Sequence, residues 1–459
     1  MMPSIQVLKK HKKRPSVKIR RPFKDFIKTE EFSGILLIMC TIIALIIANT
    51  QLANQYFELW ETYLSLSLDG FNLSKPLHLW INDGLMAIFF FVVGLEIKRE
   101  LLVGELKSLK KAILPVSAAL GGMIVPALLY MIVNISNPSA SRGWGIPMAT
   151  DIAFVIGIMA LLGTKVPFSL KIFLTSLAIV DDIGAVLIIA LFYSHNIELH
   201  YLIVAGCFLV GLFLINRLEV QNHMVYAIIG FILWYFIFIS GMHATIAGIL
   251  IAIAIPARTR INPDEFVAEG QLILERFKAA GPREREILLN RQHLAALKTL
   301  ELSCLNVQTP LQRFERGLHY WVAFSIIPLF IFSNAGIAIE VIELSMFLQP
   351  ITLGIIIGLV FGKQMGIFLF AWISIKLGLT ELPSGLTWGH IYGGAWLGGI
   401  GFTMSLFMAS LALIDPNNLI MAKIGIITGS LISGIVGYLI LRYVHIKSQK
   451  SNPTPSKST

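Results

Sequence analysis

Residues 176–192 read SLAIVDDIGAVLIIALF, an apolar run with two adjacent aspartates, Asp181 and Asp182, near its centre. A membrane-spanning helix needs roughly 20 mostly apolar residues, and the wider segment 167–193 supplies that length. A carboxylate inside such a span costs roughly 2.5–3.5 kcal/mol on insertion, so it usually faces a partner or a water-filled path. A surface loop is the alternative interpretation, and the long apolar flanks disfavour it.

The composition of the whole chain agrees with this interpretation. Of 459 residues, 56% are hydrophobic and only 14% are charged, whereas soluble domains carry roughly 25% charged residues. The mean hydropathy is +0.75. This composition excludes a soluble enzyme, a disordered protein and a nucleic-acid-binding module. The three cysteines are far apart and odd in number, which argues against a disulfide framework or a metal cluster.

The fold class predicted is an all-α polytopic membrane protein with about twelve transmembrane helices. The apolar runs that predict these helices lie near residues 33–50, 77–97, 112–134, 146–163, 167–193, 199–216, 223–238, 241–257, 319–338, 351–376, 391–413 and 419–445.

Lysine and arginine residues are concentrated in a few polar blocks. Residues 1–32 form a basic leader, and further basic blocks lie at 98–111, at 258–316 and in the tail 447–459. The positive-inside rule places these blocks, and therefore both termini, in the cytoplasm. The same rule requires the uncharged run 223–257 to be split into two spans. The first apolar run is long and its basic leader is extended, so this run is interpreted as an uncleaved anchor rather than a signal peptide.

Three polar segments have predicted local structure. Segment 64–75 alternates apolar and polar residues around Asp69-Gly70, a turn signal that predicts a β-hairpin. Segment 258–316 is a charge-mixed loop with helix-like apolar spacing, interpreted first as a solvated spacer or regulatory loop. The tail has the composition of a disordered segment.

The fourth and eleventh spans are interrupted by glycine and proline: Gly143, Gly145 and Pro147 in one, and the run YGGAWLGGIG at 392–401 in the other. Such residues permit local unwinding where the backbone lines a cavity. Two interrupted spans, one in each half, indicate a transporter site at the bilayer midplane. For the eleventh span, a glycine-rich packing face is the competing interpretation.

Three further side chains are candidates for an ion site. Thr150 and Asp151 follow Pro147, and their oxygens together with freed carbonyls would suit a hard cation such as sodium or lithium. Asp151 as an ordinary helix cap is the alternative. Lys363 lies in the middle of the tenth span, where a buried ammonium needs a counter-charge such as an aspartate of the fifth span. A lysine that snorkels to the membrane surface is the alternative.

Several charged motifs occur in a characteristic order within these spans: LWINDGLMAIFFFVVGLEIKREL at 79–101, ATDIAF at 149–154, LAIVDDIGA at 177–185, GMHATIAG at 241–248, FGKQMGI at 361–367 and GGIGFTMSLF at 398–407. In these motifs the chain resembles the NhaA family of bacterial sodium/proton antiporters from about residue 33 to 446. The resemblance implies an inverted-repeat transporter whose fourth and eleventh helices are broken and cross at mid-membrane.

The resemblance also implies roles for individual residues. Asp182 matches the central cation- and proton-binding aspartate, and Asp181 its neighbour, which pairs with the lysine matching Lys363. Thr150 and Asp151 match residues at the crossing, so sodium is expected at Asp182 and Asp151.

Outside the ion site the resemblance implies a cytoplasmic mouth and a pH-response region. Glu96 matches the inner-mouth glutamate, while Glu315 and His319 resemble the pH-response region. Arg316 stands where a histidine is more familiar in the family, and the leader and the 258–311 loop look longer than in the best-known members. The 64–75 segment resembles a periplasmic hairpin through which a homodimer forms.

The function expected from the residues and the resemblance together is exchange of cytoplasmic Na⁺ or Li⁺ for external H⁺ across the inner membrane, by competition at one aspartate site with alternating access, activated at alkaline pH. No cofactor and no nucleic-acid partner are expected; the partners are the ions and the lipid bilayer. Three alternatives remain open: an antiporter that prefers K⁺, a proton-coupled carrier of an organic solute, and an intramembrane aspartyl protease that uses Asp151 and Asp182.

Overall fold

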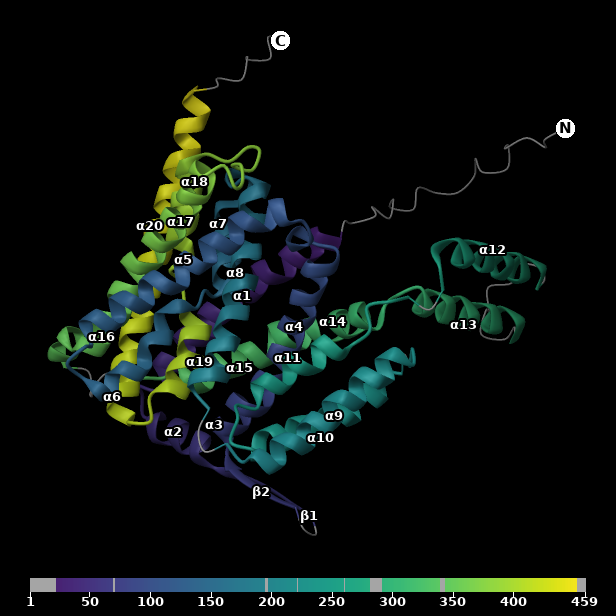
Figure 1. The fold of residues 1–459 in the computed structure, drawn as a ribbon, viewed down its shortest axis with the longest axis horizontal. Coiled ribbons are helices and arrows are strands. Elements are labelled where there is room, and N and C mark those ends of the chain that lie inside the picture. Colours follow the sequence, from purple (N-terminus) through teal and green to yellow (C-terminus); the bar gives the residue numbers. More distant parts are fainter. Residues whose placement is uncertain are drawn as a thin grey trace.

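The computed structural model describes residues 22–451, except residues 69–70, 195–196, 221, 260, 281–290 and 339–342. These parts of the chain form helices and one two-stranded sheet (Figure 1). The fold is therefore that of an all-α membrane protein with a small β-hairpin, as predicted. The basic leader up to residue 21, the hairpin turn at 69–70 and the last eight residues of the tail lie outside the described residues.

Among the described residues, seven helical stretches are long and apolar enough to cross a membrane. They are Leu77–Leu102, Leu109–Val133 (α5), Phe168–Phe192 (α8), Leu199–Arg217 (α9), Pro310–Asn334, Pro350–Lys376 and Pro416–Lys447. The first comprises α3 (Leu77–Leu79), η1 (Trp80–Leu85) and α4 (Met86–Leu102). The last belongs to α20 (Pro416–Ser451). Each stretch covers one of the apolar runs that predict a span. A run of roughly twenty apolar residues in lipid forms a helix because a helix satisfies its backbone hydrogen bonds internally.

Three of these stretches change helix type along their length. In the first, η1 is a π-helix between α3 and α4. The stretch from Pro310 comprises α14 (Pro310–Trp321), η6 (Val322–Ile326) and α15 (Ile327–Asn334). The stretch from Pro350 comprises α16 (Pro350–Ile357), η9 (Gly358–Gly362) and α17 (Lys363–Lys376). The middle element of each is a π-helix, and Lys363 follows directly on one of them.

Two further pairs of apolar helices are bent at a short break. One pair is Pro138–Met148, made of α6 (Pro138–Ser141) and η3 (Arg142–Met148), followed by α7 (Ile152–Leu162), with a bend of 44°. The other is α18 (Trp388–Gly398) followed by α19 (Phe402–Ala412), with a bend of 41°. Both breaks lie in the segments that glycine and proline mark as interrupted.

Three shorter apolar helices complete the bundle: the part 32–47 of α1 (Pro22–Ile47), α10 (His223–Ile239) and α11 (Thr245–Ala254). The run 223–257 is thus divided, and Gly241 in the break has a φ of 83°, which favours glycine. This division is the one that the positive-inside rule predicts. A total of twelve membrane crossings stays a prediction, since these three helices are shorter than a full span.

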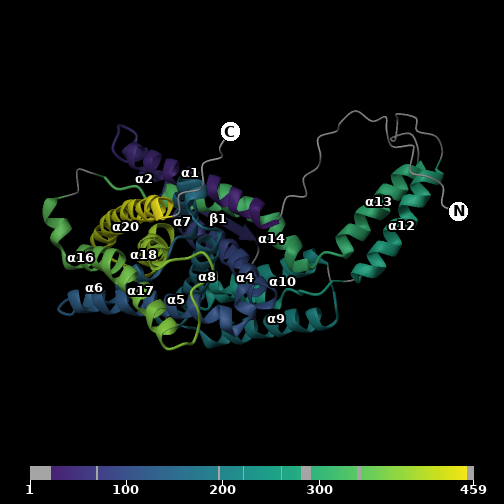
Figure 2. The ribbon, with the colours of Figure 1, turned by 90° about the horizontal axis from the view of Figure 1, so that it is seen from above.

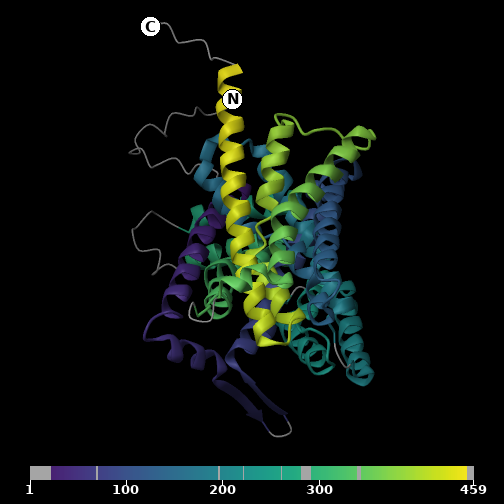
Figure 3. The ribbon, with the colours of Figure 1, turned by 90° about the vertical axis from the view of Figure 1, so that its left-hand side faces the viewer.

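The hairpin predicted from segment 64–75 is present. Strand β1 (Tyr63–Leu68) pairs antiparallel with β2 (Phe71–Pro76), with Tyr63 opposite Pro76 and Leu68 opposite Phe71. The short helix α2 (Ala53–Glu61) precedes it. In Figure 3 the hairpin projects from one end of the molecule, and the C-terminal end of α20 projects from the other.

The charge-mixed segment 258–316 contains two helices, α12 (Pro263–Ala279) and α13 (Arg291–Asn306). They pack on each other, and His293 Nε2 lies 3.0 Å from the Phe277 carbonyl oxygen. Figures 1 and 2 show this pair projecting sideways from the bundle. The next helix, α14, begins at Pro310, earlier than the predicted span, because Thr309 and Gln312 form a capping box.

Helices α5 and α17 approach very closely, at Gly121 and Gly366. A Cβ atom on either glycine would fall on the backbone of the other. Lys363 is one turn before Gly366 on α17, so this contact places the turn that carries Lys363 next to α5.

Gly366→Ala should lower the free energy of unfolding by about 1–3 kcal/mol, because the added methyl group forces two packed backbones apart. Thermal unfolding of the purified protein in detergent measures this. Gly206→Ala is the matched control, since a Cβ at Gly206 meets nothing within 4 Å. The control should be neutral or stabilising by up to about 1 kcal/mol. Equal effects of the two substitutions would contradict the close approach.

Candidate functional site

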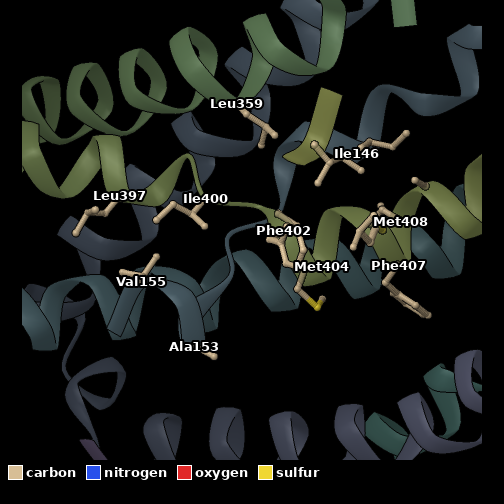
Figure 4. Close-up of a cluster of buried hydrophobic side chains, with 14 of the residues drawn as sticks. Ile146, Ala153, Val155, Leu359, Leu397, Ile400, Phe402, Met404, Phe407 and Met408 are labelled. Atoms are coloured by element: carbon tan, nitrogen blue, oxygen red, sulfur yellow. The ribbon is translucent and has the colours of Figure 1, made fainter. Parts of the chain in front are cut away.

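The two helix breaks, at residues 149–151 and 399–401, satisfy each other's polar groups. The Asp151 N–H donates to the Ile400 carbonyl oxygen at 2.7 Å. Next to the breaks, the Ser405 hydroxyl of α19 donates to the Ile146 carbonyl oxygen of η3 at 2.7 Å. Apolar side chains, including Ile146, Ile400 and Phe402, surround this crossing (Figure 4). A backbone that leaves helical geometry inside a membrane needs such partners, so the two breaks stabilise one another.

Asp151 is both a helix cap and a link between the breaks. Its Oδ1 accepts from the Phe154 N–H at 3.2 Å, which caps α7. Its Oδ2 accepts from the Thr403 N–H at 2.8 Å and also from the Thr403 hydroxyl. The capping interpretation of Asp151 therefore describes one of its two oxygens, while the other oxygen is held by the start of α19.

Sequence patterns alone do not single out Thr403 as a site residue. It lies in the motif 398–407, but only the glycines of that motif signal a function there.

Thr403→Val keeps the side-chain shape and removes the hydroxyl donor to Asp151. Because hydrogen bonds to charged groups contribute about 1.5–3 kcal/mol, thermal unfolding should show a loss of that size. Thr403→Ser keeps the donor and should recover most of the stability; equal losses for both variants would contradict the role of the hydroxyl.

Lys363 and Asp181 form a fully buried ion pair. Lys363 Nζ lies 2.5 Å from Asp181 Oδ2, and both side chains are 0% exposed. The ammonium also donates to the Met148 carbonyl, just before the first break. The lysine therefore does not snorkel. The Thr150 hydroxyl lies 2.6 Å from the same Asp181 oxygen and 2.9 Å from the Gly398 carbonyl, so it connects the ion pair to the crossing.

Asp181 and Asp182 each have a buried Oδ1 without a hydrogen-bond partner, but Asp181 Oδ2 is held by Lys363 and Thr150. For the Asp182 side chain the described residues supply neither a hydrogen bond nor an ion pair. The residue is 6% exposed, and its Oδ1 is buried without a hydrogen-bond partner. Asp181, Asp151 and Lys363 all act on it electrostatically. These four groups comprise three carboxylates and one ammonium, so the site attracts cations when all are ionised. An unpaired carboxylate oxygen is costly to bury, and a bound proton or cation would satisfy it.

Glu96, Glu315 and His319 form a second cluster, where α4 meets α14. Glu315 forms an ion pair with Arg99, and His319 Nδ1 lies 3.9 Å from Glu96 Oε1. The family resemblance implies roles at the inner mouth and in the pH response for these three residues. The structure places them together although more than 200 residues separate Glu96 from the other two.

Within the described ranges, no three His, Cys, Asp or Glu side chains are placed to hold one metal ion.

In this helical membrane protein, two helix breaks meet beside a buried cluster of carboxylates and one ammonium group. This is the architecture of a secondary transporter for ions. The chain belongs to the Na⁺/H⁺ antiporter 1 family, whose model matches residues 24–441. This family consists of transporters, which speaks against the intramembrane protease.

Individual relatives cover nearly the whole chain. The Na(+)/H(+) antiporter NhaA 2 of Syntrophotalea carbinolica is 47% identical over 92% of this chain and 96% of its own length. The Na(+)/H(+) antiporter NhaA of Oleidesulfovibrio alaskensis is 45% identical over 93% and 95%. The Na(+)/H(+) antiporter NhaA of Acidithiobacillus ferrooxidans is 46% identical over 95% and 99%. The family resemblance drawn from the motifs is therefore confirmed.

Proposed function

We propose that this protein exchanges cytoplasmic Na⁺ or Li⁺ for external H⁺, and that Asp182 carries both ions in turn. The observation that carries this proposal is that Asp182 has a buried, unpartnered oxygen and, unlike Asp181, no ion pair among the described residues. That oxygen lies in a carboxylate-rich cluster next to the two breaks, where a proton and a small cation would compete for it. The names of the relatives support Na⁺ and H⁺ as the exchanged ions.

The mechanism follows from this competition. Na⁺ arriving from the cytoplasm binds ionised Asp182, with Asp151, Thr150 and carbonyls of the breaks as further oxygen ligands. The site then turns outward, releases Na⁺ and takes up a proton, so the inward proton gradient drives the cycle. Lys363 either keeps Asp181 charged or exchanges a proton with it.

The architecture that we propose has twelve crossings arranged as an inverted repeat, with the two bent helix pairs as its fourth and eleventh spans. Alternating access then moves the bundle around the crossing. The protein lies in the bacterial inner membrane with the leader 1–32 and the tail 447–459 in the cytoplasm. The charge distribution supports this orientation, as does the position of the hairpin at the end of the molecule away from the C-terminal end of α20.

We further propose a homodimer formed through the periplasmic hairpin. The hairpin has only two strands, so each strand has one edge without a partner in the sheet. Free strand edges pair readily with another chain, and a second copy would supply the matching edge.

We assign the pH response to Glu96, Glu315 and His319, at the cytoplasmic end of α4 and α14.

Competition between a proton and a cation at the ion site also makes exchange depend on pH. A cation binds a carboxylate only after the proton has left, so exchange should rise with pH. For direct competition, the apparent KM for Na⁺ should rise by up to about tenfold for each unit of pH below the range where the site is protonated. Initial rates in vesicles at several Na⁺ concentrations and pH values measure this. A KM that is independent of pH would contradict competition at one site.

Exchange itself is tested in inside-out vesicles from a host that lacks antiporters. Respiration acidifies the interior, NaCl, LiCl or KCl is added, and a pH-sensitive dye follows the gradient. Na⁺ and Li⁺ should dissipate the gradient, most strongly at alkaline pH. A response to K⁺ alone would keep the exchanger class and refute the selectivity. No response to any cation, with folded protein in the membrane, would favour a carrier of an organic solute.

A further inference from the structure

The projecting pair α12 and α13 exposes three leucines on one of its faces. Leu274, Leu294 and Leu297 are 51%, 41% and 42% exposed. Each directly follows a buried residue, and one residue turns about 100° around a helix. Because the two helices run in opposite directions (Figure 1), this step brings all three leucines to the same side of the pair. The buried residues that they follow are Ile273, His293 and Ala296.

Two of these leucines border a groove on the outside of the pair. Its volume is about 600 Å³, and its described lining residues are Leu294, Ala295, Leu297, Lys298 and Glu301. All five belong to α13, which projects from the bundle together with α12 (Figure 2). An apolar surface of this kind in a polar part of a chain marks a place where another segment docks.

The half of the pair nearer the membrane helices is acidic. Residues 263–270 of α12 and 299–306 of α13 contain four acidic residues and no lysine or arginine. The four are Asp264, Glu265, Glu269 and Glu301. They are exposed, and none of them forms an ion pair with another described residue. Since Glu301 also lines the groove, carboxylate and leucine side chains share one surface. Such a surface attracts a basic segment that carries apolar residues.

The part of the basic leader before α1, residues 1–21, has the complementary composition. It contains no Asp or Glu, and its basic residues are Lys9, Lys10, Lys12, Lys13, Arg14, Lys18, Arg20 and Arg21. The apolar residues Ile5, Val7 and Leu8 lie before the cluster 9–14. Away from α1, the leader therefore has first basic and then apolar residues. Away from the membrane helices, the pair has first carboxylates and then the three leucines, so the two orders match.

The leader is attached close to the base of the pair. Helix α1 runs in the same direction as α14 and α15, because the Ser33 hydroxyl donates to the Ala323 carbonyl at 3.2 Å and the Asn49 amide donates to the Ile337 carbonyl at 2.8 Å. The starts of α1 and α14 thus lie at the same end of the bundle, and α13 ends just before α14. Twenty-one extended residues span up to about 70 Å, whereas the 16 residues of α13 span about 24 Å.

We propose that residues 1–21 dock on the face of α12 and α13 that carries Leu274, Leu294 and Leu297. The apolar side chains of Ile5, Val7 and Leu8 cover these leucines, and the basic cluster 9–14 lies beside the carboxylates nearer the membrane helices. Docking connects α1 to the segment that leads into α14. This interaction is additional to the proposed exchange and does not depend on it.

Carbodiimide cross-linking of the purified full-length protein in neutral detergent tests the docking, because it joins lysine amines to carboxylates that touch them. The parent should give links from lysines 9–13 to Glu301, Glu269 or Asp264, identified by mass spectrometry. The double variant Leu294→Ser/Leu297→Ser keeps every linked group but loses apolar contact, so the yield should fall at least about fivefold.

A matched control is available on the opposite face of the same pair. Leu272 and Leu302 are 48% and 51% exposed, and each directly precedes a buried residue, so both turn to the other side. Leu272→Ser/Leu302→Ser should therefore cross-link like the parent.

The bands of a denaturing gel separate links within one chain from links between copies. Links in the monomer band that only Leu294→Ser/Leu297→Ser weakens would support the proposal. Equal losses in both double variants, or no link from the leader to the pair, would overturn it. Links confined to the dimer band would also overturn it, since the leader of a second copy would then occupy the groove.

Discussion

Asp182→Asn should abolish cation-coupled proton movement, with a fall in exchange rate of at least about 100-fold. Asparagine has nearly the shape of aspartate but cannot release a proton or carry a charge. It therefore holds neither of the two ions that compete at the site. The buried Oδ1 of Asp182 has no hydrogen-bond partner in the described structure, and the neighbouring carboxylate, Asp181, is already paired with Lys363. Dissipation of a respiratory proton gradient by Na⁺ in inside-out vesicles measures the loss.

The stability of this variant separates a lost site from a lost fold. Because the substitution removes an unpaired buried carboxylate, its thermal unfolding temperature should be equal to or above that of the parent. Asp415→Asn is a suitable control, since Asp415 is an exposed aspartate at the start of α20 and should leave exchange unchanged. Residual exchange above about a tenth of the parental rate in folded Asp182→Asn would refute its central role.

Lys363→Met should have the largest effect on stability, a loss of about 3–5 kcal/mol. The substitution leaves the Asp181 carboxylate without its counter-charge in a place where both side chains are 0% exposed. It also removes the donor to the Met148 carbonyl at the first break. The unfolding temperature of the purified variant in detergent should therefore fall sharply.

A double variant tests whether the uncompensated charge is the cause. Asp181→Asn/Lys363→Met removes both charges and should recover most of the lost stability, since replacing a buried ion pair by neutral groups is often nearly neutral. The coupling energy between the two sites should then amount to at least about 1 kcal/mol. Additive losses from the two single substitutions would contradict a direct ion pair.

The sequence predicts the membrane spans and their breaks well, because both depend on local composition. A run of twenty apolar residues has few alternatives in lipid, and glycine or proline within such a run marks a backbone that needs other partners. The prediction that α10 and α11 are separate helices depends on charge placement alone. In the structure the break between them includes Gly241.

Charges in unusual places also allow part of the site to be predicted. Asp181, Asp182 and Lys363 are conspicuous because ionisable groups are rare inside spans. The sequence does not determine which aspartate pairs with the lysine, since adjacent helical residues point about 100° apart. The structure pairs Lys363 with Oδ2 of Asp181, and among the described residues Asp182 has no such ion pair. The roles of these residues in transport stay predictions.

Contacts between distant segments could not be predicted from local patterns. Thr403 is an ordinary threonine in the sequence and becomes part of the site only because the second break meets Asp151.

Proton release on Na⁺ binding tests the central claim most directly. Purified protein in weakly buffered detergent solution at alkaline pH is mixed with NaCl, and the pH change is recorded. Competition at Asp182 predicts that the parent acidifies the solution as Na⁺ binds, and that Asp182→Asn releases no proton although it is folded. Acidification of equal size by the parent and by Asp182→Asn would contradict the assignment of both ions to Asp182.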